Sequence, residues 1–178
     1  MGCEKILLPF GRSTILETIL QSLDAAGVAE RVAVLRPDLP EAAERVRRAG
    51  ARVVFNPRPE EEMLLSIRLG LESLSIDPRA VFVWPADHPA VSLATLELLA
   101  GRADPARALL PTQAGRRGHP ALVGRDLLPA IASIPPREGL RSLWRTRADA
   151  VVEVPVEDPG VVLNIDTPED YRAALGIE

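Results

Sequence analysis

Two aspartates follow apolar runs at the points where buried strands would stop, Asp87 in Asp-His-Pro and Asp166 in Asp-Thr-Pro. In open α/β sheets ligands bind beyond the carboxyl ends of the strands, so we expect both carboxylates to face one crevice. A carboxylate pair suits Mg2+, which completes its coordination shell with water and phosphate oxygens. The alternatives are structural: Asp166 or Thr167 would cap the helix that follows, and Asp87 would complete a turn.

Four further side chains could bind an anion, each with a simpler alternative. Lys5 is the only lysine among 21 basic residues, and its compact ammonium suits a phosphate, although chance explains its isolation equally well. His88 and His119 each precede proline on extended or turn backbone, where a histidine is more often solvated than catalytic. Arg68 lies near the start of an expected helix beside Ser66, where an anion would find both groups, or it is an exposed helix arginine.

The composition limits the class of protein. The chain has 178 residues, 47% of them hydrophobic, which predicts one globular domain spanning residues 1–178. A net charge of -4 disfavours nucleic-acid binding, and no apolar run is long enough for a membrane span, so we expect neither nucleic acid nor membrane as a partner. One cysteine excludes an intrachain disulfide and favours a cytoplasmic location.

Short β-branched runs alternate with amphipathic stretches, and Gly or Pro separates them. This rhythm predicts an α/β fold, a three-layer Rossmann-like architecture with a mostly parallel sheet and helices on both faces. The Thr14 and Glu17 pair is a capping box that opens the first helix, which Gly27 ends. Strands are expected at 31–35, 52–56, 80–86, 107–111, 151–156 and 161–165. Further helices are expected at 40–49, 61–74, 92–100, 126–132, 140–147 and from Thr167 onward.

Five segments, taken in order, resemble the MobA-like NTP transferase family, and in particular its molybdenum cofactor cytidylyltransferase branch. Residues 1–11 (MGCEKILLPFG) look like the second half of the family signature LAAGxSxRMGxxKxLLPxG. The others are Asn-Pro at 56–57 with the helix start at 63–70 (MLLSIRLG), Asp-His-Pro at 87–89, RGHP at 117–120 and NIDTPED at 164–170. Their shared order makes the resemblance specific, and it extends over nearly the whole chain.

This resemblance implies a nucleotide-diphospho-sugar transferase-like fold and a Mg2+-dependent nucleotidyltransferase. An NTP, with CTP favoured over GTP, would transfer its NMP to a small phosphate-bearing acceptor such as molybdopterin and release pyrophosphate. Lys5 would contact the phosphates, and Asp87 and Asp166 would hold the metal. The further partner that we expect is a molybdoenzyme or, through exposed sheet edges, a second copy of the chain. The resemblance assigns nucleotide or substrate binding to Gly2, Asn56, Ser66, Arg68, His88 and His119.

The chain departs from the family pattern at three places. It begins inside the signature, so we expect either about 15 to 20 further residues upstream in the natural protein or a degenerate relative. Glu62 stands where the family has glycine, and His88 replaces glutamine. The alternative function is therefore a non-catalytic nucleotide- or cofactor-binding module. A sugar-phosphate nucleotidyltransferase or a glycosyltransferase is a third, although no Asp-x-Asp motif supports the latter.

Overall fold

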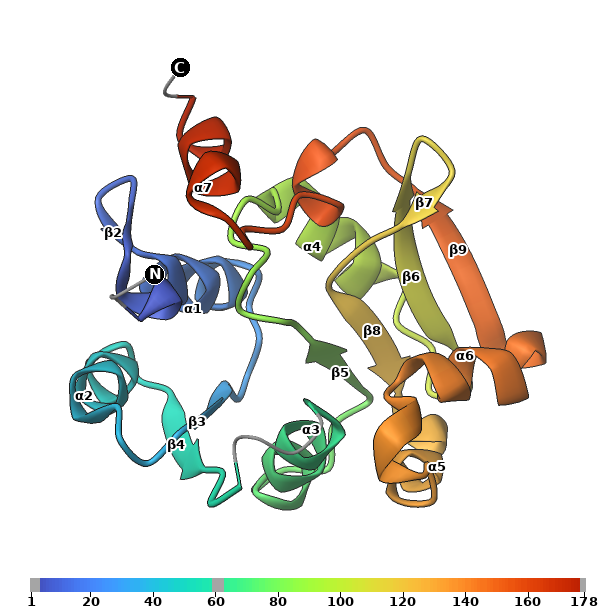
Figure 1. Ribbon diagram of the computed structural model, residues 1–178. Helices are drawn as coiled ribbons and strands as arrows, with labels where there is room; N and C mark the ends of the chain where they lie inside the picture. The colour runs from blue at the N-terminus through green and yellow to red at the C-terminus, as the bar shows by residue number, and fades with distance from the viewer. Residues whose placement is uncertain (1–3, 59–62, 177–178) are drawn as a thin grey trace.

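The computed structural model describes residues 4–58 and 63–176, in which helices and strands alternate along the chain (Figure 1). The strands are β1 Pro9–Phe10, β2 Ser13–Thr14, β3 Val32–Leu35, β4 Arg52–Phe55, β5 Ala80–Val83, β6 Ala108–Gln113, β7 Arg116–Arg117, β8 Ala121–Gly124 and β9 Val151–Pro155. The α-helices are α1 Ile15–Ala25, α2 Pro40–Arg48, α3 Met63–Glu72, α4 Leu93–Gly101, α5 Leu128–Ala132, α6 Arg141–Thr146 and α7 Pro168–Ala174. Short 3-10 helices are η1 Lys5–Leu7, η2 Arg125–Leu127, η3 Pro136–Glu138, η4 Ala148–Ala150 and η5 Pro159–Val161.

The strand pairing is mixed, whereas the sequence predicts a mostly parallel sheet. β3 and β4 form a parallel pair, and β6 pairs with β9 in the same way. β5 with β8, β6 with β8 and β6 with β7 are antiparallel. β5, predicted to be a buried central strand, has one partner among the described residues, β8, and is half-buried. The α/β class itself is confirmed.

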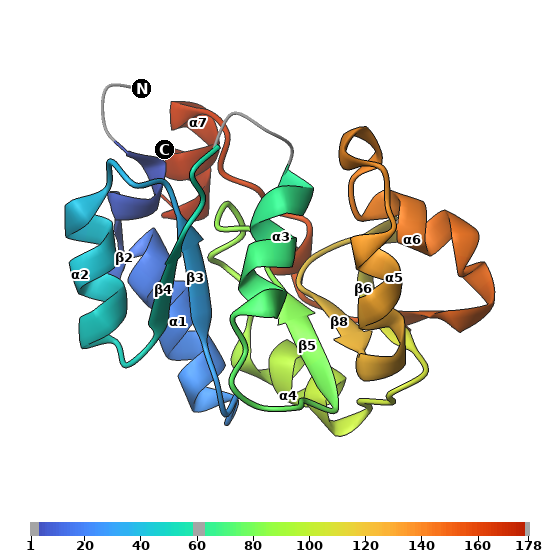
Figure 2. The same cartoon turned by 90° about the horizontal axis from the view of Figure 1, so that it is seen from below.

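Helices cover both faces of the sheet, because successive side chains of a strand point to opposite sides. In β6, Ala108 and Leu110 pack in a core with residues of α3, α5 and α6. Leu109, which lies between them, packs with Leu99 of α4 on the other face. Figure 2 shows α4 and α6 on opposite sides of β8. The predicted three layers are therefore present. Within the described ranges, no helix combines the length and apolarity needed to cross a bilayer.

The segment 161–165, predicted to be a strand, contains no strand. The helix η5 ends at Val161, and the chain continues as irregular backbone to α7. Its polar backbone groups bond to other loops in place of a sheet ladder: the Val161 carbonyl accepts from His119 N, and Ile165 N donates to the Asp87 carbonyl, both at 2.8 Å. The β-branched residues therefore fill the core, where Val161 and Ile165 are fully buried, without forming a strand.

Two glycines let three loops meet closely. A Cβ atom on Gly118 would collide with the Val161 carbonyl, and one on Gly160 would collide with the Ala90 carbonyl. The loops that contain Asp87, His119 and Asp166 are thereby packed against one another backbone to backbone. Replacement of either glycine forces the loops apart, because the atoms that it meets belong to the main chain.

Asp158 anchors the third of these loops to helix α4. Its buried carboxylate accepts hydrogen bonds from Ser92 N at 2.9 Å, from Thr95 Oγ1 at 2.7 Å and from Gly160 N at 2.9 Å. Burial acts to raise the pKa of Asp158, but these hydrogen bonds outweigh it and lower the pKa below the ordinary value. The charged carboxylate thus caps the first turn of η5 and also binds the N-terminus of α4.

We expect Gly118→Ala to lower the free energy of unfolding by about 1 to 3 kcal/mol, the usual range for forcing extra atoms into a packed site. Gly101→Ala is the matched control, because a Cβ there meets no atom within 4 Å. It should leave stability unchanged or raise it by up to about 1 kcal/mol, since glycine is the poorer helix residue. Urea unfolding followed by circular dichroism measures both, and equal stabilities of the two variants would contradict the close-packing argument.

Candidate active site

Asp87 lies in a turn after β5 that the structure fixes on two sides. Trp84 Nε1 donates a hydrogen bond to the His88 carbonyl at 3.0 Å, and the Asp87 carbonyl accepts from Ile165 N. The Asp87 side chain is 29% exposed. Its Oδ1 atom is buried and has no hydrogen-bond partner among the described residues. A carboxylate oxygen in this position is available to a ligand.

The cap of helix α7 is made by residues other than Asp166. The Thr167 hydroxyl accepts from Asp170 N, and the Asp170 carboxylate accepts from Thr167 N, which completes a capping box. The Asp166 carboxylate instead receives a hydrogen bond from Lys5 Nζ at 3.1 Å and a second from Asn164 Nδ2. The capping alternative for the Asp166 side chain is therefore wrong, and Lys5 and Asp166 are in direct contact.

Helix α7 holds the segment that carries Lys5. The Tyr171 hydroxyl donates to the Pro9 carbonyl, and Tyr171 packs in the same core as Phe10 and the fully buried Ile165. Because Ile165 also bonds to the Asp87 backbone, one buried residue connects the positions of Lys5, Asp87 and Asp166. The structure thus brings together the three residues that the sequence nominates as catalytic.

The two histidines, His88 buried and His119 half-buried, pack against each other beside Asp87. Their ring centroids are 4.7 Å apart, and the Nδ1 atom of each is buried without a hydrogen-bond partner among the described residues. His88 Nε2 lies 3.7 Å from Asp87 Oδ1. Burial, followed by the charge of Lys5, lowers the pKa of His88 despite the opposing charges of Asp87 and Asp166. Burial, then His88 and Arg141, lowers the pKa of His119 to about 4. Both imidazoles are therefore neutral at pH 7.

Asn56 and Ser66 contact each other across the gap between β4 and α3. The buried Asn56 donates from Nδ2 to Ser66 Oγ at 3.0 Å, and its Oδ1 accepts from Arg58 N at 2.9 Å. These bonds tie the end of the strand to the first turns of the helix. Their predicted contacts with nucleotide stay a prediction.

Arg68 is occupied elsewhere in the fold. Its guanidinium donates to the main-chain carbonyls of Ile131 at 3.2 Å, of Ala132 at 2.9 Å and of Ile134, which satisfies the end of helix α5. Because the Arg68 guanidinium is already hydrogen-bonded to these carbonyls, it is not free for the anion binding expected beside Ser66. Gly2, the remaining predicted nucleotide contact, lies outside the described residues, as does Glu62.

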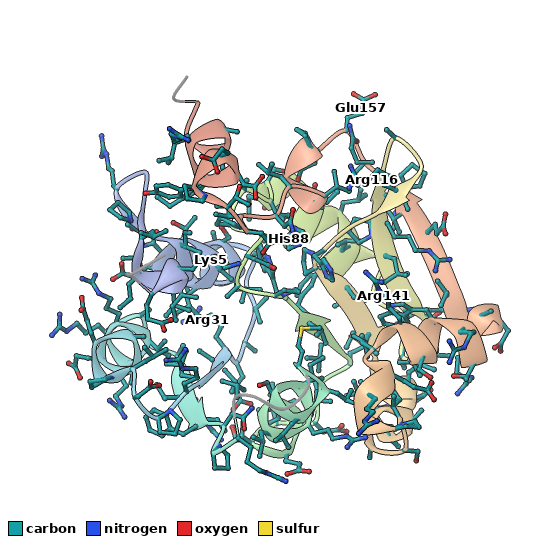
Figure 3. All side chains as sticks on the ribbon, in the orientation of Figure 1. Lys5, Arg31, His88, Arg116, Arg141 and Glu157 are labelled. Atoms are coloured by element: carbon teal, nitrogen blue, oxygen red, sulfur yellow. The ribbon has the colours of Figure 1, made fainter. Side chains whose placement is uncertain are left out.

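Sequence reasoning did not single out Arg141 or give a role to Asn164. Arg141 begins helix α6 (Figure 3), and its charge contributes to the lowered pKa of His119. One arginine among many on an amphipathic helix gives no signal, so only the fold distinguishes it. Asn164 does lie inside the NIDTPED segment, and its hydrogen bond to Asp166 explains why a side-chain amide stands two residues before that carboxylate.

The carboxylates fit a hard divalent cation. Asp87 offers a buried oxygen without a partner, and Asp166 offers an exposed carboxylate whose Oδ1 is held by Lys5. In the described part of the chain, no group of three or more His, Cys, Asp or Glu side chains is arranged to hold a metal. A cation here would therefore have the two carboxylates as ligands and take the rest of its shell from water and phosphate, the pattern usual for Mg2+.

The pattern of the MobA-like NTP transferase domain matches residues 1–152. The chain belongs to this family. It is 29% identical over 179 residues to a phosphoenolpyruvate guanylyltransferase from Mycobacterium sp. (strain KMS), across 97% of this chain and 79% of that protein. It is 25% identical over 178 residues to the molybdenum cofactor cytidylyltransferase of Escherichia coli K12, across 98% of this chain and 88% of that protein. MobA-like relatives are thus nucleotidyltransferases that differ in base and acceptor.

The fold of the chain is similar to the folds of several solved structures. A nucleotidyl transferase from Methanothermobacter superposes with a TM-score of 0.85 at 26% identity, over 98% of this chain and 84% of that chain. Rv0371C from Mycobacterium tuberculosis H37Rv in complex with manganese superposes with a TM-score of 0.77 at 26% identity, over 98% and 93% of the two chains. The predicted nucleotide-diphospho-sugar transferase-like fold is confirmed, and the manganese complex supports a divalent metal in the family.

We expect the His119 imidazole to titrate near pH 4 in the folded protein, against an ordinary value of 6.5. Between these values the unfolded chain binds the proton and the folded protein does not, so acidification from pH 6.5 toward 4 lowers the free energy of unfolding. NMR titration of the imidazole protons measures the pKa. Urea unfolding of the wild type and His119→Gln at pH 7 and 5 measures the linkage, which should be weaker in the variant. A His119 pKa near 6.5 would contradict the buried neutral pair.

Proposed function

We propose that this protein is a Mg2+-dependent nucleotidyltransferase that transfers an NMP group from an NTP to a phosphate on a small acceptor. The observation that carries the proposal is the Lys5–Asp166 ion pair beside Asp87, with both aspartate loops joined by the Ile165 backbone hydrogen bond. Family membership supports the reaction class, and the manganese complex of a relative supports a divalent metal.

The reaction needs little covalent chemistry from the protein. An oxygen of the acceptor phosphate forms a bond to the α-phosphorus of the NTP. The bond between that phosphorus and the oxygen that bridges the α- and β-phosphates breaks, and pyrophosphate leaves with the electron pair. Catalysis of such transfers consists mainly of positioning and of neutralising negative charge. When bound, Mg2+ supplies charge neutralisation and a template for the phosphates. Asp87 and Asp166 would hold it.

Lys5 would exchange partners when nucleotide binds. Its ammonium pairs with Asp166 at 3.1 Å, and the side chains of the two residues are 30% and 58% exposed. Ion pairs with this degree of exposure contribute little to stability, so giving one up costs little. The polyphosphate and the metal would then compete for the two members of the pair, with Lys5 donating to phosphate oxygens and Asp166 turning to the cation.

The relatives support two pairs of base and acceptor. A cytidylyl transfer to molybdopterin agrees with the branch that the sequence motifs favour, and the Escherichia coli relative supports it. A guanylyl transfer to phosphoenolpyruvate is supported by a relative of equal closeness. GTP is therefore supported as a donor as well as CTP. Because each relative pairs one base with one acceptor, identifying the acceptor would distinguish the two donors.

Asp87→Asn should lower the rate of pyrophosphate release by about 100-fold or more, because it removes an anionic ligand of the cation that would neutralise the transferring group. Asp77→Asn is the matched control, since Asp77 is an exposed aspartate that pairs with Arg125 on the surface, and its rate should equal that of the wild type. The assay pairs CTP or GTP with molybdopterin or phosphoenolpyruvate in Mg2+. Addition of EDTA should stop the reaction.

Two outcomes would overturn this proposal. Undiminished turnover in Asp87→Asn would remove the carboxylate from the mechanism. Binding of CTP or GTP without pyrophosphate release, for every pairing of donor and acceptor, would favour the alternative of a non-catalytic nucleotide-binding module.

A further inference from the structure

The segment that carries Asp166 places Asn164 on the same side of the chain as this aspartate. Exposure alternates along the segment: Asn164 and Asp166 are exposed, whereas Ile165 between them is fully buried. The two polar side chains therefore lie on the solvent side, away from the core. The hydrogen bond from Ile165 N to the Asp87 carbonyl fixes this backbone, so Asn164 and Asp166 are held next to each other near Asp87.

The Asp166 side chain has two polar contacts among the described residues. Lys5 Nζ donates to Oδ1 at 3.1 Å, and the Asn164 amide donates from Nδ2 to Oδ2. The Asp166 backbone is fixed separately, because its N–H donates to the Asp170 carboxylate at 3.1 Å. The main chain is therefore held in place without help from the Asp166 carboxylate. The contacts with Lys5 and Asn164 set the direction in which that carboxylate points.

One of these two contacts is lost in the proposed reaction, because Lys5 turns to the phosphates of the nucleotide and releases Oδ1. The Asn164 amide is neutral, so an arriving polyphosphate competes for it less strongly than for the Lys5 ammonium. Asn164 then provides the contact that remains, within the described residues, to a carboxylate whose side chain is 58% exposed. A side chain already held in this way loses less conformational freedom when it binds a ligand.

We propose that Asn164 is a positioning residue that holds Oδ2 of Asp166 and leaves Oδ1 for the divalent cation. This inference rests on the proposed function and adds a residue to its metal site. Carboxylates that bind metals are commonly fixed by such hydrogen bonds from a second residue, and loss of that residue typically lowers metal affinity by about 10- to 100-fold. Asn164 thus acts through Asp166 and is not itself a ligand of the cation.

The test measures the affinity of the protein for Mn2+ from the relaxation of water protons, which protein-bound Mn2+ enhances. Mn2+ is titrated alone and with CTP or GTP, without an acceptor, so that no transfer occurs. Asn164→Ala should weaken Mn2+ binding by about tenfold or more, while the urea midpoint of unfolding stays that of the wild type because the side chain is exposed. Asn164→Gln, which keeps an amide donor, should restore part of the affinity.

Gln21→Ala is the matched control. It also removes an exposed side-chain amide, one that donates to Ser13 Oγ at 3.0 Å, and it should bind Mn2+ as the wild type does.

An Asp166→Ala background distinguishes positioning from direct ligation. There, Asn164→Ala should lower Mn2+ affinity no further, because Asn164 acts only through Asp166. A further loss in that background, or unchanged affinity in the single variant Asn164→Ala, would overturn the inference and leave the proposed reaction in place. A wild type that binds no Mn2+, alone or with nucleotide, would overturn the metal-dependent reaction and this inference with it.

Discussion

The site depends on the backbone hydrogen bond between Ile165 N and the Asp87 carbonyl. The two aspartates are separated by nearly half of the chain, and each lies on a loop that has no sheet ladder to fix it. The hydrogen bond joins these loops directly, and the burial of Ile165 in a core shared with Phe10 and Tyr171 extends the constraint to the Lys5 segment. The Gly118 and Gly160 contacts bring the His119 loop to the same place.

The charged and the neutral groups of the site differ in how far they are exposed to solvent. The Lys5–Asp166 pair is partly exposed and can change partners at low cost, whereas the two histidines are buried and stay neutral. Charge is thus concentrated at Lys5 and the two aspartates, and the histidine pair offers polar atoms without net charge. No buried positive charge therefore has to be maintained when no substrate is bound.

Much of the secondary structure could be predicted from the sequence, because it depends on local signals. The Thr14 and Glu17 capping box forms as expected and begins α1, and β3, β4, β6 and β9 lie within a few residues of their predicted ranges. Strand pairing was less predictable. An apolar run indicates that a strand is buried, but not which strand it pairs with or whether the pair is parallel. The segment 161–165 was mispredicted for a similar reason. Its buried β-branched residues are typical of a strand, but its backbone groups form hydrogen bonds with other loops instead of with a strand.

The sequence by itself determined the family, many of the helices and strands, and the three catalytic candidates, because ordered motifs and apolar periods are properties of the chain read one residue after another. The tertiary structure alone decided which polar groups remain available. It engaged Arg68 with the carbonyls of α5, gave the cap of α7 to Thr167 rather than Asp166, and left the Nδ1 atoms of both histidines without a partner among the described residues. The physical reason is that a polar side chain's role depends on which partners lie within hydrogen-bond distance, and folding sets those distances between residues far apart in sequence.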